Sequence, residues 1–579
     1  MLYDVNLGIR DYFTYTDAML NNSLFSYFLM KNGLDVYKGE STRDVICLDF
    51  DFGSRSYAQE LKRLEKLRDD CVDDDMRIRI QSAIERVQSN KDLYNPRSRD
   101  AIREFFYENG VDVTYKKKDK TGNVVSAETI HYKMLFRTSA KAKLGQVIFI
   151  NETLYDKAYE WLTMGLGSRM SSDNAKIVEI SAYAPLTTSN IVGSMEIPVE
   201  DILILQDQDS FFTTMANIVC AEEYRDKKGT IRKRCKVVSK ETQVKNTLWD
   251  GMALIESAIL PDWISGMVLL RNHMFKACAF RTHIQKFFRD WCASTGNDYE
   301  TYQVSDMFGR NHYLRDIKMI TTDNAIKWKK FRDLMGEDPY EYWCDRIRLD
   351  GNVWGIVKTD HPSKLGNYQQ LSYQMVNTLP CSRDEIKDVA QVSIDYVERL
   401  KSDNDEFERF LRKYANEVNH YEMLADLYAQ NHDFGNSTFF RREKSLIINQ
   451  YVFRLRKGKI MVEGDNLTCC GNPYGLLLYT VGEDWQNDPT LRPEHGAIQC
   501  YTRRFDDDTF LCAFRNPHNS PNNICYLRNV YSEEMEKYFD FSKNIIVVNC
   551  IETDVQSRCN GMDFDFGNWV GLGETLFKN

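Results

Sequence analysis

Hydrophobic and polar residues alternate with two different periods along the chain, and the change of period separates predicted strands from predicted helices. The apolar run DVICLDF, residues 44–50, leads into Gly53 and then Ser54 or Ser56 as a helix N-cap, which predicts a strand running into a helix. From residue 57 to 93, Leu and Ile recur every three or four positions among many charges. This spacing predicts two antiparallel helices broken at Asp73–Asp75.

Two basic segments predict hairpins, and the second half of the chain predicts a helical block followed by strands. Residues 111–136 alternate about the turn KTGN, and the segment RDKKGTIRKRCKVV from residue 225 forms the second basic hairpin. Residues 386–430 carry apolar positions at helical spacing. After residue 445 the segments that predict strands are YVFRLRKGKIMVEGD, YGLLLYTVGED, FLCAFRNP and KNIIVVNC. The pattern as a whole predicts a mixed α+β fold with β-rich blocks flanking a helical middle.

Composition narrows the class of protein. A chain of 579 residues is too long for one core and predicts two to four domains. No stretch approaches 18 uninterrupted apolar residues and the first residues lack the order of a signal peptide, so we expect no membrane association. The fifteen cysteines show no repeating framework, which predicts reduced thiols in a cytoplasmic protein. The net charge of −10 argues against indiscriminate coating of nucleic acid, but it leaves room for a local basic channel.

An Asp-Phe-Asp string occurs twice, as LDFDFG with Asp49 and Asp51 and as MDFDFG with Asp563 and Asp565. On an extended strand, residues two apart point to the same face, so each pair of carboxylates would converge. Magnesium suits such a pair because it prefers hard oxygen ligands and leaves sites for substrate phosphates. The alternative is a turn with solvated carboxylates. The strand-end context of the first pair also suits a primase-like or phosphohydrolase-like site.

The second half of the chain contains five blocks that occur in the order of a known family. They are LWDGMALIESAIL, SGMVLLRNHMFKACAF, ITTDNAIKWKKF, GKIMVEGDNLTCCGNPYGLLLYTVGE, and the run from LCAFRNPHNSPNNICYLRNVY through NIIVVNC to RCNGMDFD. Together they resemble the catalytic region of the cellular RNA-dependent RNA polymerases and their bacterial and phage single-chain relatives. The blocks extend from about Asn246 to the C-terminus, a little over half the chain.

The resemblance implies two double-psi β-barrel-type domains joined by a helical region and preceded by a mixed α/β N-terminal domain. The predicted domains are residues 1–235, with the helical hairpin near 57–93; residues 236–340, the first barrel; residues 341–444, mainly helical; and residues 445–579, the second and incomplete barrel.

The same resemblance implies the site. Asp563 and Asp565 match the first two metal-binding aspartates, and Lys276 and Lys330 match lysines that contact the triphosphate. The implied cofactor is two Mg²⁺ ions, with Mn²⁺ as an alternative. The implied substrates are nucleoside triphosphates and an RNA or DNA template. For the two lysines, surface positions are the alternative. Arg515 and Arg558 are candidates for contacts with nucleic acid or phosphate. Arg515 could instead hold its own loop.

The chain departs from the family in three ways. Gly567 stands where the family has a third aspartate, and Lys276–Ala277 replaces a Lys-Gly pair. The chain also stops at Asn579, before the expected end of the barrel, so we expect a truncated enzyme or one completed by a second chain.

Three functions therefore stay open. The first is an RNA polymerase-like nucleotidyl transferase, either active, inactive or half of a split enzyme, in a cell, plasmid or phage. The second is a primase-like or phosphohydrolase-like metal site at Asp49 and Asp51. The third is a degenerate, non-catalytic fragment that binds nucleic acid through the basic segments at residues 116–120 and 225–234.

Overall fold

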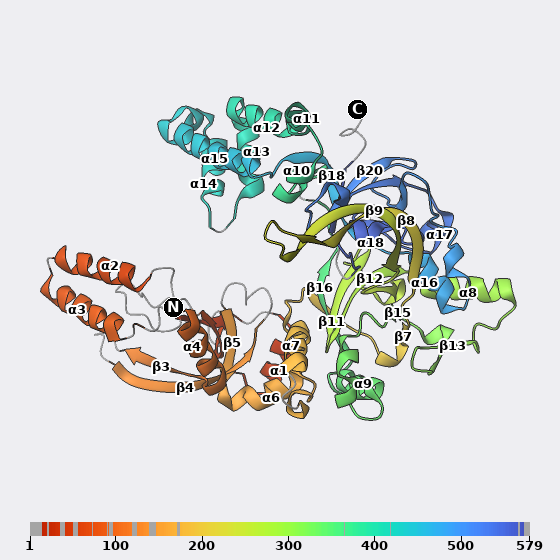
Figure 1. Cartoon of the computed structure of the whole chain (residues 1–579), viewed down its shortest axis with the longest axis horizontal. Coiled ribbons are helices and arrows are strands. Elements are labelled where there is room, and N and C mark those ends of the chain that lie inside the picture. Colours follow the sequence, from red (N-terminus) through yellow and green to blue (C-terminus); the bar gives the residue numbers. More distant parts are fainter. Residues whose placement is uncertain are drawn as a thin grey trace. The chain divides into compact units, whose positions relative to one another are not determined.

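The computed structural model describes most of the chain, namely residues 14–19, 22–34, 41–49, 56–71, 73–89, 91, 96–118, 124–137, 146–170, 174–363, 365–416, 418–564 and 568–572. The fold is mixed α+β, with strongly curved sheets (Figure 1). The chain divides into two compact units, each built from three segments. The first unit comprises Met1–Val199, Leu270–Lys276 and Ile326–Lys358, and the second comprises Glu200–Leu269, Ala277–Ala325 and Thr359–Asn579.

An antiparallel sheet of five strands forms the N-terminal part of the first unit. In sheet order its strands are β1 (Thr14–Met19), β2 (Ser41–Asp49), β5 (Gln146–Asn151), β4 (Val124–Phe136) and β3 (Val111–Lys118). Its core contains Ile46, Leu48, Val111, Val113, Tyr132, Val147 and Phe149. The predicted strand at residues 44–50 is confirmed as β2, and the first basic hairpin is confirmed as β3 and β4, while its tip, residues 119–123, lies outside the described residues.

The predicted pair of charged helices is also confirmed. Helices α2 (Tyr57–Asp69) and α3 (Asp74–Ser89) pack through Leu64 and the apolar face of α3. Ser56 is the N-cap: its hydroxyl accepts a hydrogen bond from the Gln59 N–H, and the Gln59 side chain accepts one from the Ser56 N–H. The other helices of the first unit are α1 (Leu24–Lys31), α4 (Pro96–Asn109), α6 (Glu152–Leu162), α7 (Asn174–Tyr183) and α9 (Pro339–Leu349).

The second basic hairpin is much longer than the sequence predicts. Strands β8 (Asp209–Arg225) and β9 (Ile231–Thr247) pair in register over their whole length and form a long curved ribbon (Figure 1). The turn between them contains Gly229 with φ of 77°, a left-handed conformation that glycine adopts without strain.

Two sheets have seven strands each. The first has the order β6 (Gly193–Glu196), β16 (Val353–Thr359), β11 (Met267–Asn272), β12 (Phe275–Thr282), β10 (Met252–Glu256), β15 (Met319–Thr322) and β7 (Ile202–Leu205). The second has the order β17 (Tyr368–Gln370), β18 (Met461–Cys470), β22 (Ile545–Val548), β19 (Ile498–Tyr501), β21 (Ile524–Asn529), β20 (Phe510–Arg515) and β23 (Asn568–Leu572). In this second sheet β23 pairs with both β20 and β18, so six of the strands, from β18 to β23, form a closed ring.

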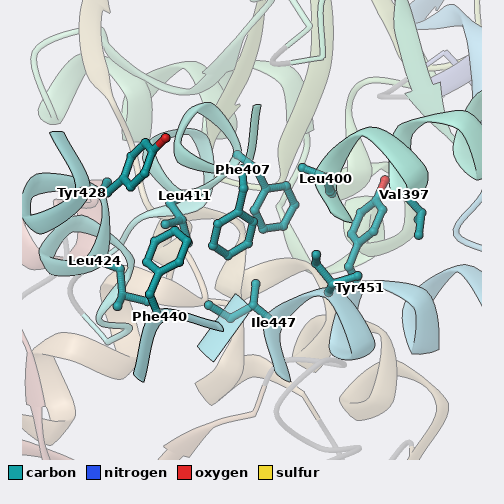
Figure 2. Packing of buried hydrophobic residues seen from close by; sticks show 12 residues of the cluster. Val397, Leu400, Phe407, Leu411, Leu424, Tyr428, Phe440, Ile447 and Tyr451 are labelled. Atoms are coloured by element: carbon teal, nitrogen blue, oxygen red, sulfur yellow. The ribbon is translucent and has the colours of Figure 1, made fainter. Parts of the chain in front are cut away.

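A helical region precedes β18 and extends further than predicted. It contains α10 (Tyr373–Thr378), α11 (Arg383–Val389), α12 (Gln391–Ser402), α13 (Asn404–Tyr414), α14 (Tyr421–Gln430) and α15 (Thr438–Arg456). Figure 2 shows its apolar core, in which the rings of Phe407 and Phe440 pack edge to face with centroids 5.7 Å apart. The predicted strand YVFRLR is wrong, because these residues end α15. Tyr451 is buried one turn after Ile447 and Ile448, a helical spacing that the local alternation of apolar and basic residues hides.

The segment YGLLLYT is also a helix rather than a strand. Helix α16 (Pro473–Thr480) starts with Pro473 in its first turn, and Leu476 and Leu477 are both buried. A short run of apolar residues has no clear period, so the pattern is equally consistent with a buried strand and with a buried helix. The proline was the available helix signal. The remaining elements of the second unit are α8 (Ile284–Thr295), β13 (Gln303–Ser305), β14 (Asn311–Tyr313), α17 (Glu533–Tyr538) and α18 (Val555–Arg558).

Candidate functional site

Asp563 lies in a short loop between α18 and β23, which we call the acid loop and define as residues 559–564. Asn560 and Gly561 both have positive φ, 54° and 70°, and together they reverse the chain after the helix. The Gly561 N–H donates to the Gln556 carbonyl at 2.8 Å, which closes the end of α18. Met562 and Phe564 are then buried, whereas Asp563 between them is half-buried. This alternation anchors the loop on both sides of Asp563 and turns its carboxylate outward.

Arg515, the last residue of β20, holds the acid loop in place. Its Nη2 donates to Asp563 Oδ1 at 3.2 Å and its Nη1 donates to the Cys559 carbonyl at 3.0 Å. The Arg515 side chain is 15% exposed and that of Asp563 is 39% exposed, so water partly screens the ion pair. In this structure Arg515 therefore contacts its own loop, and one Asp563 oxygen is already engaged.

The loop that follows β20 also holds the acid loop. Asn523 Nδ2 donates to the Arg558 carbonyl at 2.6 Å, and Asn560 Nδ2 donates to the Pro517 carbonyl at 2.7 Å. The two ends of the fifth block, LCAFRNPHNSPNN and RCNGMDFD, are therefore joined by several hydrogen bonds.

The first block, LWDGMALIESAIL, reaches the acid loop through its backbone. The Phe564 N–H donates to the carbonyl of Asp250 in the turn Trp249-Asp250-Gly251, at 2.7 Å. Trp249 is fully buried, its Nε1 donates to the Asn472 carbonyl at 2.8 Å, and its ring stacks on a tyrosine of α16. The tryptophan thus fixes the turn that supports the loop.

Gly471 explains how closely these blocks pack. A Cβ placed on Gly471 would lie 2.2 Å from the Leu248 carbonyl oxygen and 3.1 Å from the Phe564 ring. No side chain fits there, so the residue that follows β18 must be glycine if the turn and the acid loop are to meet.

A half-buried carboxylate holds the other side of the Trp249 turn. Asp207 accepts hydrogen bonds from the Thr322 hydroxyl at 2.8 Å, the Asn324 side chain at 2.9 Å and the Trp249 N–H at 3.2 Å. Burial nevertheless raises the pKa of Asp207 from its ordinary value of 3.8 to about 6. This carboxyl group therefore exchanges a proton near neutral pH at a position two contacts away from Asp563.

Asp207 was not among the predicted site residues, although its sequence context carries a signal. Asp207 and Asp209 follow the apolar strand ILIL, so the chain has a third strand end with an Asp-x-Asp pair. Asp209 is engaged separately, by the Thr247 hydroxyl and by Lys245, each at 2.7 Å.

Arg558 lies next to the acid loop but is engaged within its own helix. Its Nη2 and Nε contact the two carboxylate oxygens of Asp554 at 2.5 and 3.2 Å. The thiols of Cys525 and Cys559 lie 3.3 Å apart beneath this segment, and both are buried.

The two predicted lysines belong to the first unit. Lys276 is half-buried near the start of β12, between the buried Phe275 and Ala277. Ala277 lies in this extended strand and not in the left-handed region, so it needs no glycine. Lys330 is exposed: its Nζ lies 3.0 Å from Glu179 Oε1 and 5.4 Å from the Tyr183 ring. Its partners raise the pKa of Lys330, first through the hydrogen bond to Glu179.

The other predicted residues lie partly outside the described chain. Asp49 is the half-buried last residue of β2, opposite Gln146, whereas Asp51, Asp565 and Gly567 are outside the described residues. The same holds for the side chains of residues 116–120.

The acid loop fits a magnesium ion in chemical kind, because Asp563 presents a hard carboxylate oxygen and Mg²⁺ is commonly held by one or two carboxylates together with substrate phosphates. Among the residues that the structure describes, no group of three or more His, Cys, Asp or Glu side chains is arranged to hold a metal. A magnesium site here would therefore draw on Asp563, on Asp565 and on the substrate.

Within the described ranges, no helix combines the length and the apolar character needed to cross a bilayer. When the chain is compared with known proteins, no protein-family model and no curated protein sequence matches it.

Proposed function

We propose that this chain is an RNA polymerase-like nucleotidyl transferase that joins nucleoside triphosphates on an RNA or DNA template. We propose further that its two seven-stranded sheets correspond to the two double-psi β-barrels of that class. The observation that carries the proposal is the convergence of three colinear blocks, the first, fourth and fifth, around Asp563. The blocks are separated by up to 300 residues in the sequence, yet they meet through the Asp250 carbonyl, Gly471, Arg515 and Asn523.

The geometry supports this function better than a solvated turn. A solvated Asp-x-Asp turn needs no support, whereas the acid loop is held by two buried side chains, by side-chain hydrogen bonds that link it to Arg515 and to the Pro517 carbonyl, and by a backbone hydrogen bond to Asp250. Such support is what a catalytic carboxylate requires, since an error of about 1 Å in its position costs on the order of a hundredfold in rate.

In the proposed site, Asp563 and Asp565 would hold Mg²⁺, which supplies charge neutralisation of the triphosphate and activation of the attacking hydroxyl. Arg515 keeps the Asp563 carboxylate in its outward position and offsets its charge. Lys276 and Lys330 are the proposed triphosphate contacts, and Lys330 would have to leave Glu179 in order to act. Strand β23 closes the ring of six strands that would form the second barrel.

The test is template-directed incorporation of labelled nucleotides with Mg²⁺ or Mn²⁺, on single-stranded RNA and on DNA. We expect Asp563→Ala to lose several kcal/mol of transition-state stabilisation, on the order of a thousandfold in rate. Asp426→Ala is the matched control, because Asp426 is an exposed carboxylate on α14 that pairs with Arg412. Incorporation that persists in Asp563→Ala, or none by the wild-type chain, would contradict the proposal.

A further inference from the structure

The ribbon of β8 and β9 has two faces of different chemistry. In a paired ribbon, alternate residues point to opposite faces, and directly opposed residues share a face. The pairs Glu222 with Arg234 and Tyr224 with Arg232 therefore lie on one face. We call this face the basic face and define its cations as Arg232, Arg234, Lys236 and Lys240.

The opposite face is apolar and electrically balanced. Met215, Val219 and Val237 are each about two-thirds exposed there, and Val219 is directly opposite Val237. Lys233 on this face pairs with Glu223 at 3.6 Å. The excess of positive over negative charge is thus concentrated on the basic face of the ribbon.

The concentration of charge is unusual for this chain. Residues 225–240 contain eight Lys or Arg residues and one Asp, although the whole chain carries a net charge of −10. The basic-face cations are largely exposed, with Arg232 at 61% and Arg234 at 59%. The ribbon therefore presents a positive surface that attracts a polyanion while the rest of the chain repels one.

The spacing of these cations fits a nucleic-acid backbone. Alternate residues of a strand advance about 6.7 Å, and every second phosphate of a duplex strand advances about 6.8 Å along the helix axis. Seventeen residues of strand extend over about 55 Å, more than one turn of a duplex, and a two-stranded ribbon is narrow enough to follow a groove. Arg232, Arg234 and Lys236 would thus meet alternate phosphates of one strand.

We propose that the basic face of the β8–β9 ribbon binds the phosphate backbone of double-stranded nucleic acid, without reading its sequence. Identifying that duplex as the template paired with its product rests on the proposed function, but the binding itself does not. RNA and DNA duplexes share the phosphate chemistry, so the measured affinities for the two duplexes decide which one the ribbon prefers.

Substitution of Glu222 offers a test in which the proposal predicts stronger rather than weaker binding. Its carboxylate lies 2.8 Å from Arg234 and 3.4 Å from Lys236, so one negative charge is shared by two cations. If these ion pairs serve only to stabilise the ribbon, Glu222→Gln weakens the ribbon and improves nothing. If the cations bind phosphate, Glu222→Gln removes a competitor and strengthens binding.

The experiment measures binding of labelled RNA and DNA duplexes of about three helical turns by fluorescence anisotropy, without nucleotides, over about 50 to 200 mM salt. The test variant replaces all four basic-face cations with Gln. The matched control, Lys401→Gln, Arg409→Gln, Arg412→Gln and Lys413→Gln, removes the same charge from α12 and α13. Circular dichroism and thermal unfolding of each variant confirm that it is folded.

The slope of log K against log salt should fall by about 3 to 4 in the test variant, close to 0.9 per lost phosphate contact, and by less than about 1 in the control. Glu222→Gln should steepen the slope by about 1. Equal losses in the test and control variants, or weaker binding by Glu222→Gln, would overturn the proposal. If duplex binding depends on the basic-face cations but the wild-type chain incorporates no nucleotides, this inference stands and only the polymerase function is contradicted.

Discussion

The raised pKa of the half-buried Asp207 carboxyl predicts that the support of the acid loop depends on pH, and Asp207→Asn tests this directly. The folded pKa of about 6 lies above the ordinary value of 3.8, so the folded chain keeps a proton that the unfolded chain has already released. Stability should therefore be greatest below about pH 4 and should fall as pH rises toward about 6. At about 1.4 kcal/mol for each tenfold change in proton affinity, the total loss is about 3 kcal/mol.

Asn can keep most of the contacts of Asp207. Its Oδ1 can accept from the Trp249 N–H, and its amide can donate to the Thr322 hydroxyl. The variant lacks the ionisation, so its free energy of local opening should change little between pH 4 and 7.5, while that of the wild type falls by about 3 kcal/mol.

The assay is hydrogen exchange of peptides that cover residues 202–210 and 246–256, corrected for the intrinsic pH dependence of exchange. Asp426→Asn, on the helical region, is the control for removing a carboxylate elsewhere. A difference between wild type and Asp207→Asn that stays constant from pH 4 to 7.5 would show that Asp207 is ionised throughout and would refute the reasoning.

Two further predictions concern the packing around the acid loop. Gly471→Ala should lower the free energy of unfolding by about 1 to 3 kcal/mol, because its Cβ would overlap the Leu248 carbonyl, which is backbone and cannot rotate away; urea unfolding measures this, and a neutral effect would contradict the close approach. Arg515→Gln should accelerate hydrogen exchange in the peptide over residues 558–564, since it removes the bonds to Asp563 and to the loop carbonyl. The cost in overall stability should be only about 1 kcal/mol because the pair is partly exposed, and unchanged exchange would contradict the role of Arg515.

Local signals predicted the local structure well. The strand before Ser56, the charged helix pair and both basic hairpins follow from spacing and capping that operate within about twenty residues. The predictions failed where neighbouring residues gave the wrong period. In YVFRLR, apolar and basic residues alternate as in a strand, but Tyr451 packs into a helical core with Phe410 that only tertiary contacts define.

The ribbon shows a different limit. Residues 209–224 contain threonines, small residues and few regular alternations, so their pattern did not predict a strand as long as β8. Pairing with β9 supplies the backbone hydrogen bonds that the pattern alone does not indicate.

For the candidate site, the order of the sequence blocks predicted Asp563 and Arg515, but it did not predict the residues that surround them. The carbonyl of Asp250 contributes through its backbone, which leaves no mark on residue type. Asp207 comes to the site by a contact with Trp249, 42 residues later in the chain, and such a contact cannot be read from one sequence.

The most direct test of the central claim is metal-directed cleavage of the chain. Fe²⁺ bound in place of Mg²⁺, with ascorbate and peroxide, generates radicals that cut the backbone near the bound ion. We predict cuts within about ten residues of Asp563 and at residues 515–523, suppressed by excess Mg²⁺ and absent in Asp563→Ala. Cleavage confined to the neighbourhood of Asp49, or a pattern unchanged in Asp563→Ala, would contradict a metal site at the acid loop and the polymerase function with it.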